Sequence, residues 1–300
     1  MDPGVLKESY RISRHLIDDL QRKVQKLPAD WYKQPDFLAT LVEAFADDAE
    51  FLTLYAHILA YISHDYDAAE TYYQQAMSIE PEYAESFAGY ARFLDFIRRD
   101  YDKAEDYYLR AIDMAPDDAE YLGKYAIFLY YIREDYTQAD AYYLKAIQAN
   151  PQHAGVLGSY ASFLSLIIGD YQQAEQFYQK ALEIEPENVG TLGSYAYYLY
   201  HIKTRHREAD TYYLRALELA PEDVDNLGNY AIFLENVKKD YDAAESCYQK
   251  AIALKPDDTF LLSNYAMFLD YARKDEKRAD FYYNRVKILE KQNREHSYGD

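Results

Sequence analysis

The chain has 300 residues, 52 acidic and 32 basic, and a formal net charge of −20. This balance disfavours nucleic-acid phosphates, which attract clustered Lys and Arg, and favours basic partners. A single cysteine rules out an intrachain disulfide, and the sequence shows neither a signal-peptide core nor an apolar run long enough to span a bilayer. We therefore expect a cytoplasmic protein with no membrane span and no nucleic-acid partner.

Residues 1–49 predict an N-terminal helical cap. Apolar residues at three- and four-residue steps indicate a helix over residues 5–26. A bend with the only tryptophan, Trp31, precedes a shorter helix from about Asp36 to Ala46. A stack of repeats needs an atypical end unit to cover its first apolar face. A separate ligand-binding role for Trp31 is the alternative to capping.

From about residue 50 the sequence repeats with a fixed period. Two columns recur every 35 residues, one of tyrosine and one of proline: Tyr55, Tyr90, Tyr125, Tyr160, Tyr195, Tyr230 and Tyr265, and Pro81, Pro116, Pro151, Pro186, Pro221 and Pro256. The chain holds 36 Tyr against 13 Phe, and tyrosine at fixed spacing indicates a packing residue whose hydroxyl reaches a polar partner. A period of this length is typical of stacked units that share one core.

Each unit reads as two helices. In the sixth unit, the apolar stripes of the two helices are Leu227, Tyr230, Ala231, Leu234 and Val237, then Ala244, Tyr248, Ala251, Ile252 and Leu254. An Asp-Tyr turn separates the helices, and its aspartate can accept a hydrogen bond from an N–H group of the second helix. The proline then ends that helix. A single hairpin cannot bury its stripe, so we expect seven to stack with no domain boundary inside the array.

These columns resemble the tetratricopeptide repeat. The matching residues of the sixth unit are Leu227, Tyr230, Ala231, Leu234, Ala244, Tyr248, Ala251 and Pro256. One departure is the period of 35 rather than 34, with the extra residue between Leu234 and Asp240, which predicts a longer first helix. The other is that alanine occupies the family's glycine column, while a new column appears at Gly123, Gly158, Gly193 and Gly228.

The resemblance implies an all-α, right-handed superhelical solenoid of seven helical hairpins behind the N-terminal cap. The expected divisions are a cap at 1–49, repeats at about 50–84, 85–119, 120–154, 155–189, 190–224, 225–259 and 260–290, and a C-terminal tail at 291–300. It also implies that the first helices line a concave face that binds a peptide or helix of another protein. Members of this family are rarely enzymes, so we expect a non-catalytic scaffold or adaptor.

The first-helix columns not needed for packing are expected to form a peptide-binding groove. Counted from the new glycine column, these positions are i+4, i+7 and i+8: Arg92, Asp95, Phe96, Ile127, Tyr130, Tyr131, Ser162, Leu166, Tyr197, Tyr200, His201, Ile232, Glu235, Asn236, Met267 and Tyr271. Dense exposed aromatics mark contact surfaces, so the ligand is expected to be apolar with some basic residues. The alternative is packing against the neighbouring first helix, to which Tyr131 and Tyr271 are especially open.

Two features of this face leave alternatives open. The four glycines open the groove floor to a ligand backbone, let adjacent first helices approach more closely, or simply lie near the helix start. The run Lys203-Thr204-Arg205-His206-Arg207 replaces the usual turn in the fifth unit. It either docks an acidic segment or is a tolerated variation. Arg92 and Lys124 are isolated, so no clamp for a chaperone's C-terminal carboxylate is expected.

No cofactor, metal or catalytic group is expected. His201 and His206 are five residues apart, unlike a metal-binding pair at i, i+4. Cys247 replaces a tyrosine of a packing column, so packing is its expected role. Two alternatives to the scaffold remain: a self-associating structural protein that forms homodimers, or a bacterial effector delivered into a host cell to recruit its proteins.

Overall fold

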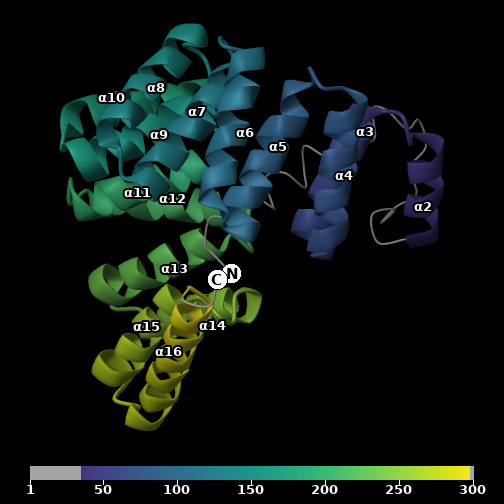
Figure 1. Ribbon diagram of the computed structural model, residues 1–300. Helices are drawn as coiled ribbons and strands as arrows, with labels where there is room; N and C mark the ends of the chain where they lie inside the picture. Colours follow the sequence, from purple (N-terminus) through teal and green to yellow (C-terminus); the bar gives the residue numbers. More distant parts are fainter. Residues whose placement is uncertain (1–34, 298–300) are drawn as a thin grey trace. The chain divides into compact units, whose positions relative to one another are not determined.

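The computed structural model describes residues 35–297, and the side chains of residues 40–292. Within that range every regular element is a helix and there is no strand, which confirms the all-α prediction. Figure 1 shows the helices following one another along the chain. The predicted helix over residues 5–26 and Trp31 lie outside the described residues.

The helices alternate between first and second members of a hairpin. In chain order they are α2 (Pro35–Ala44), α3 (Ala49–Ile58), α4 (Tyr66–Ile79), α5 (Ala84–Phe93), α6 (Tyr101–Met114), α7 (Ala119–Phe128), α8 (Tyr136–Ala149), α9 (Ala154–Phe163), α10 (Tyr171–Ile184), α11 (Val189–His201), α12 (His206–Leu219), α13 (Val224–Phe233), α14 (Tyr241–Leu254), α15 (Thr259–Phe268) and α16 (Glu276–Ser297). The last helix continues through residue 297, so residues 291–297 are helical and the prediction of a tail from residue 291 is wrong for them.

Internal contacts divide the chain into two compact units. One contains residues 4–163, with the hairpins α3/α4, α5/α6 and α7/α8 followed by α9. The other contains residues 164–300, and its described part holds α10 and the hairpins α11/α12, α13/α14 and α15/α16. Within each unit a second helix packs both on its own first helix and on the next one, as α6 does on α5 and α7. The superhelical sense of the whole array stays a prediction.

The extra residue of the period forms a π-helical turn at the end of most first helices. These five-residue segments are η2 (Leu59–Ser63), η3 (Leu94–Arg98), η4 (Leu129–Arg133), η5 (Leu164–Ile168), η6 (Leu234–Lys238) and η7 (Leu269–Arg273). The next residue adopts the left-handed conformation, as at Glu134 with φ 53° and Lys239 with φ 56°. The first carbonyl of the segment then accepts from the following aspartate, at 3.0 Å from the Asp135 nitrogen to the Leu129 oxygen. The predicted longer first helix is therefore confirmed.

Aspartates cap the second helices as predicted. The Asp135 carboxylate accepts a hydrogen bond from the Gln138 N–H at 3.0 Å, and the Asp240 carboxylate accepts one from the Ala243 N–H at 3.1 Å. Such a bond satisfies one of the amide groups that have no partner within the helix. Every second helix from α4 to α14 ends two residues before its proline, as α14 does at Leu254.

The core consists of the predicted columns. In the sixth hairpin, Tyr230 is 6% exposed and Tyr248 is 1% exposed. Their rings lie against those of neighbouring hairpins: the ring centroids of Tyr248 and Tyr265 are 5.5 Å apart. The small Ala244 and Ala251 are fully buried and let the helices approach closely. Leu254, predicted as part of the stripe, is instead exposed at the end of α14.

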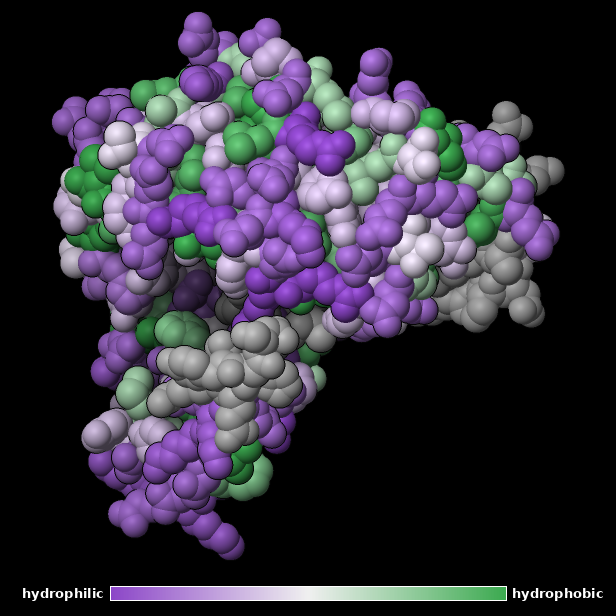
Figure 2. All heavy atoms as spheres, in the orientation of Figure 1, coloured by the Kyte–Doolittle hydropathy of each residue, from purple (hydrophilic) through white to green (hydrophobic). Residues whose placement is uncertain are grey.

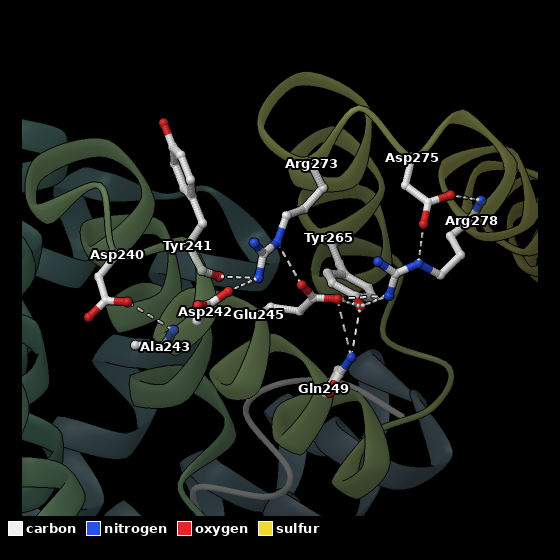
Figure 3. A network of polar contacts seen from close by, with 10 residues as sticks. All are labelled: Asp240, Tyr241, Asp242, Ala243, Glu245, Gln249, Tyr265, Arg273, Asp275 and Arg278. Atoms are coloured by element: carbon white, nitrogen blue, oxygen red, sulfur yellow. Dashed lines mark hydrogen bonds and ion pairs between the residues drawn. The ribbon is translucent and has the colours of Figure 1, made fainter.

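A polar contact joins consecutive hairpins at the edge of this core. The Tyr265 hydroxyl donates to Glu245 of the preceding second helix at 3.2 Å, and Arg273 pairs with the same carboxylate at 2.7 Å (Figure 3). Arg273 also reaches Asp242 at 2.5 Å. The same arrangement recurs where Tyr125 donates to Glu105. The prediction that the tyrosine hydroxyls reach polar partners is confirmed at these positions.

Candidate functional site

Successive first helices leave one side of each compact unit uncovered, which we call the open face. Its residues follow the spacing i, i+4, i+7, i+11 along a helix and its π-helical extension, which places them on one stripe. In the unit of residues 4–163 they are Glu120, Lys124, Ile127 and Tyr131, and in the unit of residues 164–300 they are Leu166, Ser194, Tyr197, His201, Asn229, Ile232, Asn236, Phe260, Asn264, Met267 and Tyr271.

The open face carries several large apolar side chains in contact with solvent. Tyr131 is 61% exposed, Tyr271 is 70% exposed and Met267 is 46% exposed. The alternative that Tyr131 and Tyr271 pack between first helices is therefore wrong. Hydrophilic residues otherwise predominate on the face drawn in Figure 2, where hydrophobic residues form small separate groups. Phe260, Met267 and Tyr271 lie on one stripe of α15 and η7, and exposed apolar side chains grouped in this way, unlike ones scattered singly, are typical of contact sites.

One predicted groove column lies between hairpins instead. The Tyr130 ring packs edge-on against Phe163 of the next first helix, with centroids 5.5 Å apart, and Tyr200 packs in the same way on Phe233 at 5.4 Å. Two further members of the column accept hydrogen bonds from buried tyrosines of their own hairpins at 3.3 Å: Asp95 from Tyr108, and Glu235 from Tyr248. Tyr130 and Tyr200 thus help hold neighbouring hairpins together, whereas Asp95 and Glu235 join the two helices of one hairpin, so packing is the role of these four residues.

The predicted residues of the second hairpin present little surface. Arg92 is 4% exposed, Asp95 is 5% exposed, and Phe96 is half-buried. The Arg92 guanidinium lies 5.8 Å from the centre of the Tyr61 ring. In the fourth hairpin Ser162 is half-buried and donates to the Gly158 carbonyl at 3.1 Å. The large exposed apolar side chains of the open face therefore begin at the third hairpin, with Tyr131, and include Leu166 of the fourth.

The new glycine column serves close packing of adjacent first helices. A methyl group added at Gly123 would lie 2.8 Å from a methyl carbon of Val156, and one at Gly228 would lie 2.7 Å from Leu261. At Gly193 it would lie 1.8 Å from the Asn226 amide oxygen. All three contacts come from the next first helix of the same unit, and all three glycines are buried. Of the alternatives, helix packing is the one that these three positions support.

The irregular turn of the fifth hairpin is largely neutralised within the protein. Arg205 forms ion pairs with Glu175 and Glu208, and Lys203 lies 3.4 Å from Glu175. Arg205 occupies the position of the usual capping aspartate and makes no side-chain cap. These pairs leave little free positive charge on Lys203 and Arg205, which favours the tolerated variation over an acid-docking patch.

Sequence reasoning missed two columns of the open face. Phe260, which is 60% exposed, and Asn264 precede Met267 by seven and three residues on the same stripe of α15. The third hairpin has Glu120 and Lys124 there, and they form an ion pair at 2.7 Å. The Lys124 ammonium lowers the pKa of the Glu120 carboxyl. The signal was present, because extending the helical period backwards from Met267 reaches both positions.

The single cysteine and the possible metal ligands were both candidates for reactive chemistry. Burial raises the pKa of the Cys247 thiol, which favours the unreactive protonated form. Among the described residues, no three His, Cys, Asp or Glu side chains are grouped so that they could hold a metal ion. No helix of the described range is long and apolar enough to cross a bilayer.

Family profiles match much of the array. Two are described as "Tetratricopeptide repeat", one at residues 60–128 and one at residues 195–223 and 238–258. A third, "TmcB, TPR repeats", matches residues 124–190. Among curated proteins, none matches the sequence.

Solved structures of low sequence identity share the fold. PilF of Pseudomonas aeruginosa is 21% identical, with a TM-score of 0.52 over 69% of this chain and 92% of that one. A human IFIT1 dimer with m7Gppp-AAAA is 20% identical, with a TM-score of 0.65 over 81% of this chain. The APC/C hetero-tetramer Cut9–Hcn1 is 16% identical, with a TM-score of 0.65 over 85% of this chain. The matched regions span 58% of the IFIT1 chain and 49% of the chain from the Cut9–Hcn1 assembly.

Proposed function

The chain belongs to the tetratricopeptide repeat family, and from this membership we propose that it is a non-catalytic scaffold that binds a protein partner on its open face. The observation that carries the proposal is the exposure of Phe260, Met267 and Tyr271 along one stripe of α15 and η7, at 60%, 46% and 70%. Such side chains gain free energy when a partner covers them.

The ligand that suits this surface is a peptide or helix with apolar anchors and basic residues. The apolar anchors would cover the exposed rings, and the basic residues would complement a net charge of −20. The same charge opposes a phosphate backbone, so we propose a protein rather than a nucleic-acid partner, although the similar IFIT1 structure contains m7Gppp-AAAA. A cytoplasmic location remains part of the proposal.

Partner capture with matched variants tests the open face. Met267→Ser with Tyr271→Ser removes two large exposed side chains from α15 and η7, and we expect loss of the partners that the wild-type chain captures. Phe281→Ser is the control, because Phe281 is 60% exposed but lies on α16, outside the open face. Equal capture by the open-face variant and the wild type, or equal loss with Phe281→Ser, would contradict the proposal.

Self-association is the second candidate, and one observation favours it. Phe281 and Ile288 are 60% and 58% exposed on α16, and their spacing of seven residues places them on one side of the helix. A second copy could cover this pair. Light scattering across a hundredfold range of protein concentration measures the molar mass. A mass that stays at the monomer value would exclude the homodimer. Delivery into a host cell remains an alternative that a translocation assay would test.

A further inference from the structure

Three tyrosine rings lie close together at the turn of the third hairpin, with Tyr130 between the other two in contact distance. Tyr130 and Tyr131 lie in η4, and Tyr136 is the first residue of α8. The centroid of Tyr130 is 4.0 Å from that of Tyr131 and 6.3 Å from that of Tyr136. Phe163 fixes Tyr130 from the other side at 5.5 Å, so the central ring is anchored in the core. Tyr131 and Tyr136 remain 61% and 39% exposed.

Two acidic residues, Glu134 and Asp135, lie between Tyr131 and Tyr136 in the sequence. Asp135 caps α8 through Gln138. Glu134 occupies the left-handed position at φ 53° and is exposed, and it forms no ion pair with another described residue. In the other described hairpins this position carries His64, Arg99, Gly169, Thr204, Lys239 or Lys274, so among them only the third hairpin places an acid there.

We propose that Tyr131, Tyr136 and Glu134 bind a cationic side chain of the partner, with arginine preferred to lysine. A cation gains energy over the face of an aromatic ring within about 6 Å of its centre, and a nearby carboxylate adds charge attraction. The planar guanidinium also stacks on rings, which an ammonium does not. The inference rests on the proposed function and names the chemistry that this part of the scaffold recognises.

The fifth hairpin shows why the site belongs to the third. It also gathers rings, with the Tyr200 centroid 4.0 Å from His201 and 5.8 Å from His206. Its turn, however, carries Thr204 at the left-handed position instead of an acid, and the nearby Glu175 and Glu208 are already paired with Lys203 and Arg205. Aromatic rings occur at both turns, but only the third combines them with an uncompensated acid.

Calorimetric titration of the full chain tests the inference. The probe is a capped Arg-Ser-Arg-Ser-Arg peptide, with matched lysine and glutamate peptides for comparison. We expect the arginine peptide to bind most tightly. Tyr131→Leu and Tyr136→Leu should each weaken its binding about two- to five-fold, the usual effect of a cation over an exposed ring. Glu134→Gln should weaken binding of both cationic peptides.

Tyr171→Leu is the matched control. Tyr171 occupies the same position in α10 that Tyr136 occupies in α8, is 45% exposed, and follows Ser165 and Leu166 instead of two tyrosines. None of the three leucine substitutions changes the charge, so general attraction to an acidic protein is unaffected. Wild-type affinity in the Tyr131→Leu, Tyr136→Leu double variant, or an equal loss with Tyr171→Leu, would overturn the inference. Thermal melts establish that each variant is folded.

The two proposals fail separately. Suppose the Met267→Ser, Tyr271→Ser variant loses the captured partner while the leucine variants bind the arginine peptide normally. That result would support the proposed scaffold function and contradict the cation site. If the leucine variants bind the arginine peptide more weakly but the open-face variant still captures the partner, the cation site is supported and partner binding on the open face is contradicted.

Discussion

Two hairpin contacts in residues 164–300 have the same aromatic core but different polar partners. Between the sixth and seventh hairpins, Tyr265 lies 5.5 Å from Tyr248 and 4.9 Å from Tyr282. Between the fourth and fifth, Tyr195 lies 5.2 Å from Tyr178 and 5.0 Å from Tyr212. The ring geometry is thus nearly identical at the two contacts.

The polar groups around these rings differ. Arg273, at the end of η7, pairs with Glu245 and Asp242. In the fifth hairpin, Arg205 lies two residues later in the repeat than Arg273 and pairs with Glu175, the counterpart of Glu245, in a turn with no π-helical segment. The two contacts therefore share the buried rings and a cation near the interhairpin carboxylate, but that cation comes from a different position of the repeat in each.

The largest expected effect on stability comes from removing a buried tyrosine ring that both hairpin contacts share. Tyr195→Ala and Tyr265→Ala should each lower the free energy of unfolding by about 3–5 kcal/mol, as for other buried aromatic residues replaced by alanine. Tyr→Phe at either position should cost only about 1 kcal/mol, since it removes one hydrogen bond. Urea denaturation measures all four. A much greater cost of Tyr265→Ala than of Tyr195→Ala would show that the polar partners matter more than the rings.

Two glycines of α11 should respond in opposite directions. Gly193→Ala forces a methyl group against Asn226, which is 1% exposed, so overpacking should cost about 1–3 kcal/mol. At Gly190 the nearest atom to an added methyl is 3.7 Å away, and Gly190→Ala should stabilise the helix by about 0.5–1 kcal/mol. Thermal melts compare the two. Equal effects would mean that the glycine column is not required for helix packing.

A buried histidine of the first hairpin, His57, should make the stability of the protein depend on pH. Burial, followed by Arg92 and Lys124, lowers the pKa of His57 from 6.5 to about 3. The unfolded chain therefore takes up a proton below pH 6.5 that the folded chain does not, so stability falls as the pH drops. This group should cost about 1 kcal/mol between pH 6.5 and 5.5.

His57→Gln removes this titration and should flatten that part of the pH profile of unfolding free energy. His206→Gln is the control, because His206 is exposed. An unchanged slope in His57→Gln would show that the imidazole is protonated in the folded protein.

The smallest expected effect concerns the left-handed residue after each π-helical segment. Lys239 adopts a backbone φ of 56°, a conformation that is strained for any residue with a Cβ atom. Lys239→Gly should therefore stabilise the protein by about 0.5–1 kcal/mol. Gly169 adopts φ 80° at the equivalent position, and Gly169→Lys should destabilise it by a similar amount. Differential melts measure both, and a loss of stability in Lys239→Gly would contradict the strain argument.

The candidate site was only partly predictable. Helical spacing correctly placed Ile127 and Tyr131 on one stripe, because side chains at i and i+4 share a helix face. It also placed Tyr130 and Tyr200 in the groove, since exposure and packing against a neighbouring helix have the same spacing. Their contact with Phe163 and Phe233 depends on how the next hairpin approaches. Phe260 and Asn264 were missed because the stripe was not extended towards the start of the helix.

The sequence by itself determined the helices, their caps and the hairpin repeat, because periodic apolar residues, aspartates and prolines act through local geometry. Tyr125 and its copies had to be buried, since no single hairpin covers its own stripe. Tertiary structure alone decided which side of each first helix stays open, that Gly193 lies against Asn226, and that Arg205 is held by Glu175. These contacts join residues about 30 positions apart in the chain, and their distances follow from the packing of one hairpin on the next.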